Sequence, residues 1–263
     1  MRSSCLVLSL LLPLLFCQCR KSQSGPAPLV VGMELSTPPF EMQDREGNPD
    51  GTSVRLAEDL ARTLERPLQI EVMPFKGLET ALKTGKIDLI LSSMTDTPKR
   101  RESIDFSDAY CRIGLALLVP AASTAQGLDD LKKPGTKVVA RMNTTAVDFV
   151  RQQLPDASLQ LLDNETACML EIVQKKADAF VYDQLSVLRF HLAQPEATRA
   201  LLQPLQSEAW AIALRKGEDG LRTKVNAFLA EYRKQGGFDR LAERYLKNER
   251  DALKERGVPF VFE

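Results

Sequence analysis

The chain has 263 residues, with 35 basic and 35 acidic side chains and a formal net charge of zero. This length is sufficient for one large domain or two medium-sized domains with well-developed cores. The balanced charge gives no electrostatic footprint for nucleic acid, so no nucleic-acid partner is expected.

The N-terminal residues have the pattern of an export signal. Arg2 precedes an almost entirely apolar run, CLVLSLLLPLLFC, at residues 5–17. This run is shorter than the ~20 residues with which a helix crosses a bilayer. A short basic start followed by an apolar stretch is typical of a secretory signal peptide. We therefore predict a signal peptide over 1–19, a polar linker over 20–27, and an exported, periplasmic protein.

Two cysteines, Cys17 and Cys19, lie at the end of the apolar run, where the sequence resembles a bacterial lipoprotein signal. The residues before them are Phe16 and Gln18, whereas such signals prefer a small residue there. Lipidation of Cys17 or Cys19 therefore stays open. A lipid anchor is the only membrane attachment that we expect.

The segments after the linker alternate between strand and helix patterns. We predict strands at 29–33, 67–75 and 87–93, with helices at 53–65 and 77–85. This order implies a mostly parallel sheet with right-handed crossovers.

The same alternation restarts after residue 123. We predict strands at 136–142, 159–163, 177–183 and 209–217, and helices at 145–154, 164–176, 184–192, 221–235 and 238–256. Two copies of one pattern indicate an α/β protein with two lobes, each a mostly parallel sheet flanked by helices, rather than a single sheet.

Polar residues collect where three of these strands end. They are Ser92, Ser93 and Thr95 with Arg100, then Asn143, Thr144 and Thr145, and finally Asp183. Ligands of such sheets bind beyond the carboxyl ends of the strands. We therefore expect these three clusters to face one ligand.

The chemistry of the clusters suits a free amino acid. Arg100 offers a planar fork that matches a carboxylate, and the helix start at Thr145 offers backbone N–H groups to the same anion. Asp183 suits an ammonium group. Taken alone, Arg100 could be a solvated helix charge and Asp183 the N-cap of the next helix. Together they indicate a receptor for a zwitterion.

Four stretches of the chain resemble the bacterial extracellular solute-binding proteins of polar amino-acid ABC transporters. They are TPPFEMQDREGNPDG, PFKGLETALKTGKIDLILSSMTDTPKRRESIDFSDAY, KKADAFVYD and AWAIALRKGEDGLRTKVNAFLAEYRKQGGFDRLAERYL. The resemblance implies a type II periplasmic-binding fold, with the ligand in a cleft between the lobes. It also implies a monomer that delivers a free amino acid to an inner-membrane ABC permease.

The resemblance further implies which residues contact the ligand. They are Glu34, Thr37, Phe75, Ser93 (through its main chain), Thr95, Arg100, Thr145 and Asp183. Glu34 is expected to accept hydrogen bonds from the ligand side chain, and Phe75 to form an apolar wall. An acid beside an aromatic ring favours a basic or amide side chain, so Arg, Lys, His or Gln is expected to bind best.

The chain departs from the family pattern at three places. Family members usually carry Gly where Asn143 stands and an aromatic residue where Thr37 stands, and they show G-F-D-x-D-L where this chain has GTSVRL at 51–56. Asn143 could narrow access to the backbone, and Thr37 widens the expected pocket.

The chain is expected to cross between the two lobes twice. Lobe 1 comprises 28–113 and 208–250, lobe 2 comprises 114–207, and a tail follows at 251–263. The two crossovers, near 112–116 and 203–210, form the expected hinge. Closure of the lobes about this hinge would bring the binding residues around the ligand.

Two alternatives stay open. Cyclohexadienyl (prephenate or arogenate) dehydratases resemble these proteins, and Glu34 could act in such an enzyme as a general acid. A sensor that signals to a separate membrane partner is the other alternative. The only histidine, His191, supports neither a zinc site nor a catalytic triad. No metal, cofactor or catalytic residue is expected.

Overall fold

The computed structural model describes residues 25–262, so the predicted signal peptide, Cys17 and Cys19 lie outside the described residues. The strands are β1 (Leu29–Met33), β2 (Met42–Gln43), β3 (Pro49–Asp50), β4 (Leu68–Val72), β5 (Leu89–Ile90), β6 (Ile104–Pro120), β7 (Lys137–Arg141), β8 (Ser158–Leu162), β9 (Ala179–Asp183) and β10 (Thr198–Arg215). The helices are α1 (Thr52–Thr63), α2 (Phe75–Lys83), α3 (Pro98–Arg101), α4 (Thr145–Gln153), α5 (Glu165–Val173), α6 (Gln184–Ala193), α7 (Asp219–Lys234), α8 (Gly237–Tyr245) and α9 (Lys247–Glu255), with a short 3-10 helix, η1 (Leu128–Leu131).

One eight-stranded sheet contains all strands except the small β2–β3 pair, in the order β4-β1-β5-β10-β6-β9-β7-β8. At one end β1 pairs in parallel with β4 and β5, and at the other end β7 pairs in parallel with β8 and β9. The predicted α/β class and the two parallel units are confirmed.

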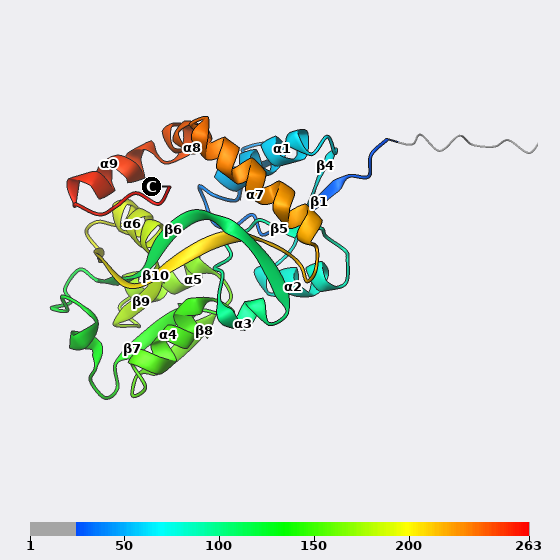
Figure 1. The fold of residues 1–263 in the computed structure, drawn as a ribbon. Coiled ribbons are helices and arrows are strands. Elements are labelled where there is room, and N and C mark those ends of the chain that lie inside the picture. Colours follow the sequence, from blue (N-terminus) through cyan, green and yellow to red (C-terminus); the bar gives the residue numbers. More distant parts are fainter. Residues whose placement is uncertain (1–24, 263) are drawn as a thin grey trace, which may run out of the picture.

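Two long antiparallel strands join these units. β6 and β10 pair from Ile104 with Arg215 at one end to Pro120 with Thr198 at the other. They run side by side through the middle of the molecule (Figure 1). The structure thus differs from the expected pair of sheets in one respect: the hydrogen-bonded ladder continues from one lobe into the other. Only residues 209–215 of β10 were predicted as a strand from the sequence, and β6 was not predicted.

Helices cover both faces of the sheet. The buried side chains accordingly form separate clusters on the two faces. In lobe 1, Leu78 of α2 belongs to one cluster, whereas Leu60 of α1 and Phe228 of α7 belong to another. In lobe 2, Phe149 of α4 and Cys168 of α5 are divided in the same way. Both lobes therefore have the helix–sheet–helix layering typical of parallel sheets.

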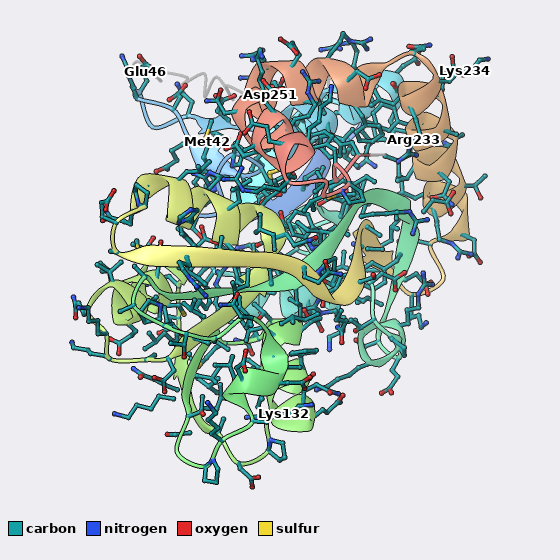
Figure 2. All side chains as sticks on the ribbon, turned by 90° about the vertical axis from the view of Figure 1, so that its left-hand side faces the viewer. Met42, Glu46, Lys132, Arg233, Lys234 and Asp251 are labelled. Atoms are coloured by element: carbon teal, nitrogen blue, oxygen red, sulfur yellow. The ribbon has the colours of Figure 1, made fainter. Side chains whose placement is uncertain are left out.

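The two lobes lie on opposite sides of the long strands. Figure 2 shows Lys132 at one end of the molecule and Lys234 and Asp251 towards the other, with β10 between them. Among the described residues, no helix is long and apolar enough to cross a membrane, and no cluster of side chains has the composition of a metal site.

The C-terminal segment folds back onto the sheet. The helix predicted over 238–256 is interrupted at Leu246, which separates α8 from α9. The backbone N–H of Arg112 in β6 donates to the carbonyl of Val261 at 2.8 Å, and Val261 is buried. The tail therefore packs against the long strand that links the lobes.

Candidate ligand-binding site

A cavity lies between the lobes, beyond the carboxyl ends of β5, β7 and β9. Its volume is about 40 Å³. Its lining includes these residues expected to bind the ligand: Thr37, Phe75, Ser93, Thr95, Arg100, Thr145 and Asp183. The clusters that the sequence placed at separate strand ends therefore meet. Glu34 does not line this cavity.

Arg100 of α3 reaches from lobe 1 to lobe 2. Its Nη1 donates to the carbonyl of Thr95 at 2.7 Å, and its Nη2 donates to the carbonyl of Asn143 at 3.1 Å. Its Nε lies 3.4 Å from a carboxylate oxygen of Glu79, and its guanidinium lies 5.6 Å from the ring centre of Phe75. Burial lowers the pKa of Arg100, and the charge of Glu79 opposes this shift. An arginine keeps its charge under such conditions.

Arg101, the next residue, points elsewhere. Its Nε and Nη2 bind the carboxylate of Asp96 at 2.6 and 2.5 Å. Its side chain is 45% exposed, compared with 11% for Arg100. The difference follows from the turn of ~100° per residue in a helix, and it leaves Arg100 alone of the two facing the cavity.

The backbone conformation of Asn143 accounts for one departure from the family pattern, the asparagine at a position where glycine is usual. Its φ of 63° lies in the left-handed region, where glycine has no steric penalty and asparagine is among the residues that tolerate it best. Its carbonyl accepts the bond from Arg100. Thr144 follows as the N-cap position of α4, so Thr145 is the first helical residue.

Ser93 lines the cavity and also contacts a buried carboxylate. It also has a left-handed backbone, with φ of 49°, and its hydroxyl donates to the two oxygens of Glu41 at 2.9 and 3.2 Å. Glu41 is fully buried, and this burial raises its pKa to about 8. Glu41 was not predicted from the sequence, because a lone acid between a turn and a short strand carries no signal of burial.

Asp183 is the N-cap of the next helix and also lines the cavity, so its expected contact with the ligand ammonium stays a prediction. It is the last residue of β9, and its carboxylate accepts from the backbone N–H of Ser186 at 2.9 Å as the N-cap of α6. It also lines the cavity, where it is 6% exposed. Burial raises its pKa, and the bond from Ser186 opposes this shift.

A second acid, Glu208, lines the cavity and was missed. It lies on β10 and accepts from the hydroxyl of Thr95 at 2.9 Å. Trp210, two residues along β10, also lines the cavity and packs edge-on against Phe40, with ring centres 4.9 Å apart. Glu208 was missed because the strand predicted from the sequence begins only at residue 209.

The pair formed by Glu34 and Arg141 was also missed. Arg141, the last residue of β7, donates through Nη2 to Glu34 across the cleft. The backbone N–H of Phe75 donates to the other oxygen of Glu34 at 3.2 Å. Both carboxylate oxygens of Glu34 are thus engaged within the protein, whereas Arg141 itself lines the cavity. Arg141 stands at the end of a strand, and this position could have identified it from the sequence as a candidate binding residue.

The charges around the cavity are balanced. Arg100 and Arg141 supply two cations, and Asp183 and Glu208 supply two acids. Threonine hydroxyls and the first turn of α4 add neutral hydrogen-bonding groups. Such a mixture can hold a small molecule that carries a carboxylate and an ammonium group together.

Comparison with known proteins agrees with this geometry. Residues 29–248 match the family described as bacterial extracellular solute-binding proteins, family 3. The chain is 26% identical to the ABC transporter glutamine-binding protein GlnH of Bacillus subtilis over 226 residues, which cover 84% of this chain and 82% of that protein.

Two solved structures are also similar. A putative ABC transporter binding component from Wolinella succinogenes, complexed with lysine, has a TM-score of 0.80 and 30% identity, covering 84% of this chain and 96% of that one. The ancestral amino acid-binding protein AncCDT-1, a precursor of cyclohexadienyl dehydratase, has a TM-score of 0.76 and 31% identity, covering 83% and 95%.

Proposed function

Because the chain belongs to the bacterial extracellular solute-binding proteins, family 3, we propose that it captures a free amino acid between its lobes and delivers it to an inner-membrane ABC permease. The observation that carries this proposal is the cavity between the lobes, lined by two cations and two acids. The chain acts as a monomer in this proposal, as its resemblance to the family implies. The proposal also includes export to the periplasm. Cys17 or Cys19 is the candidate lipid acceptor.

Arg100 binds the ligand carboxylate in this proposal. Its side chain is mostly buried and faces the first turn of α4, so the N–H groups near Thr145 bind the same anion. Thr95 and the main chain of Ser93 add polar contacts. Asp183, helped by Glu208, takes the ammonium group. Thr37 and Phe75 border the side chain of the ligand.

The lobes meet within the two long strands. Ala213 of β10 pairs with Ile90 of β5, whereas Leu115 of β6 pairs with Asp183 of β9. This change of partners supports lobe 1 over 28–113 and 208–250, and lobe 2 over 114–207. The expected crossovers near 112–116 and 203–210 fall inside β6 and β10, where they would serve as the hinge.

The enzymatic alternative relied on Glu34 as a general acid. In the structure both oxygens of Glu34 are engaged and the residue does not line the cavity. Glu34 is therefore not placed to give a proton to a substrate in the cavity. The enzymatic alternative thus loses the residue on which it relied, and binding of an amino acid is the function that we propose.

A thermal-shift screen of the twenty amino acids tests the proposal. A ligand present at 100 times its dissociation constant stabilises the folded protein by about 2.7 kcal/mol, which raises the melting temperature measurably. We expect at least one amino acid to do so. A folded protein that none of the twenty stabilises would contradict the proposal, as would turnover of prephenate or arogenate.

A further inference from the structure

Arg141 separates the cavity from a second chamber. Its side chain is 4% exposed, and together with Phe75 it lines both the cavity between the lobes and an outer chamber of about 240 Å³. Glu34 lines only the outer chamber. A ligand side chain that enters from the cavity therefore meets Arg141 before it can reach Glu34.

The guanidinium of Arg141 is held from several sides. It donates to Glu34 through Nη2, to the hydroxyl of Tyr182 through Nη1 at 3.1 Å, and to the carbonyl of Asp163 through Nε at 3.2 Å. It also lies 5.7 Å from the ring centre of Phe75. An arginine has five N–H groups, so one on each terminal nitrogen is left for another acceptor.

The place expected for a basic ligand side chain is thus already filled. An acid beside an aromatic wall is the arrangement that would attract a ligand cation, and here the chain's own guanidinium occupies it. A lysine or arginine ligand would meet a like charge in a site shielded from water, where repulsion is strong. An oxygen acceptor would meet free N–H donors instead.

We propose that Arg141 determines the side-chain specificity of the site, selecting amino acids whose side chains end in an oxygen acceptor and rejecting cationic ones. The acceptor is a carboxamide oxygen (Gln, Asn) or a carboxylate (Glu, Asp). This inference rests on the proposed amino-acid binding. It keeps Gln from the earlier preference for a basic or amide side chain and replaces the basic ligands Arg, Lys and His, which required Glu34 to be free.

Calorimetric titration of the mature protein with Gln, Asn, Glu, Asp, Arg and Lys tests the inference directly. We expect the tightest ligand to come from the first four, with Arg and Lys bound roughly tenfold or more weakly. Comparison of Gln with Glu distinguishes a carboxamide from a carboxylate. If Arg or Lys binds tightest, the inference is overturned.

Arg141→Met removes the charge and keeps much of the apolar stem. This variant should lose roughly tenfold or more in affinity for the best wild-type ligand and should gain affinity for Arg and Lys, because Glu34 becomes free. Lys76→Met is the matched control, since Lys76 is an exposed cation of the outer chamber. It should leave the ranking of ligands unchanged.

The outcomes separate this inference from the proposed function. If no amino acid binds the folded protein, the proposed function itself fails. If an amino acid binds and Arg141→Met leaves the ranking unchanged, only the role of Arg141 fails. Should Arg141→Met not fold, Arg141→Lys must keep the wild-type ranking, and the wild-type ranking alone still decides between acceptor and cationic side chains.

Discussion

Arg100 supplies the positive charge that the proposed ligand carboxylate requires. It is mostly buried, it bridges both lobes, and it lines the cavity. Arg101 carries the same charge on the same short helix but binds Asp96 in a more exposed position. The two residues therefore form a natural pair for separating a binding role from a general charge effect.

Arg100→Ala should reduce affinity for the best ligand by roughly 30-fold to several thousand-fold, because removing one partner of a buried charge pair costs ~2–5 kcal/mol. Calorimetric titration measures this loss. Arg101→Ala is the control and should change affinity less than threefold or so, since an exposed ion pair contributes only ~0–1 kcal/mol. A large effect at Arg101 without one at Arg100 would refute the assignment.

Glu41 links the protonation of a buried carboxyl to stability. Its pKa rises from an ordinary value of 4.5 to about 8. Between these two values the folded state holds a proton that the unfolded state has lost, so the free energy of unfolding falls as pH rises. Below this window both states are protonated, and above it neither is.

Glu41→Gln should remove this dependence. Relative to the variant, the wild-type protein should lose stability between pH 5 and pH 8, on the order of 1.4 kcal/mol per pH unit, as measured by urea unfolding. Glu46→Gln is the control, because Glu46 lies on the exposed surface (Figure 2) and should leave the slope unchanged. Parallel pH profiles for wild type and Glu41→Gln would count against the buried, protonated carboxyl.

At the scale of elements, strand ends and helix starts position the site. β9 ends at Asp183 and α6 begins at the next residue, so one carboxylate both caps the helix and lines the cavity. α4 begins at Thr145, four residues after β7 ends at Arg141. Binding groups at such junctions are held by backbone geometry, because the strand and the helix on either side are packed into the core.

Variants of Asp183 can separate these two roles. Asn is as good an N-cap as Asp, whereas Ala in its place costs ~0.5–2 kcal/mol of stability. Asp183→Asn should therefore fold with near wild-type stability and lose most of its affinity for an amino acid. Asp183→Ala should lose both. Calorimetry and urea unfolding on the two variants give the comparison, and full affinity in Asp183→Asn would reduce Asp183 to a helix cap.

In the molecule as a whole, side chains of the two lobes contact each other across the cavity. Arg100 from lobe 1 contacts Asn143, and Arg141 from lobe 2 contacts Glu34. The cavity is correspondingly small, so an amino acid can enter only if the lobes separate. β6 and β10 are the strands that cross between the lobes, and bending within them would allow this movement.

Small-angle X-ray scattering should detect this opening. Without ligand the radius of gyration should exceed the value calculated from the closed structure, and it should fall when the best ligand of the screen is added at saturation. Arg100→Ala, treated in the same way, should show a smaller decrease. An identical scattering profile with and without bound ligand would mean that the lobes do not move on binding.

Most of the local elements, and the candidate site residues at their ends, could be predicted from the sequence. Periodicity located nearly all helices and short strands, because burial on one face or both leaves a repeat within a few residues. The strand-end rule then placed Arg100, Thr145 and Asp183 near one ligand, since the carboxyl ends of parallel strands meet. These inferences needed only neighbours in the chain and a general rule of topology.

The pairing of side chains that are distant in the chain could be seen only in the folded protein. Glu34 and Arg141 are 107 residues apart, and Ser93 lies 52 residues from Glu41. Neither pairing leaves a periodic trace, because a single contact across the fold imposes no repeat on the sequence. The long strands β6 and β10 escaped for a related reason: each crosses from one lobe to the other and changes its partners and burial on the way. Hence the sequence predicted a receptor for a zwitterion, and the fold showed that Arg141 lines its cavity and pairs with Glu34.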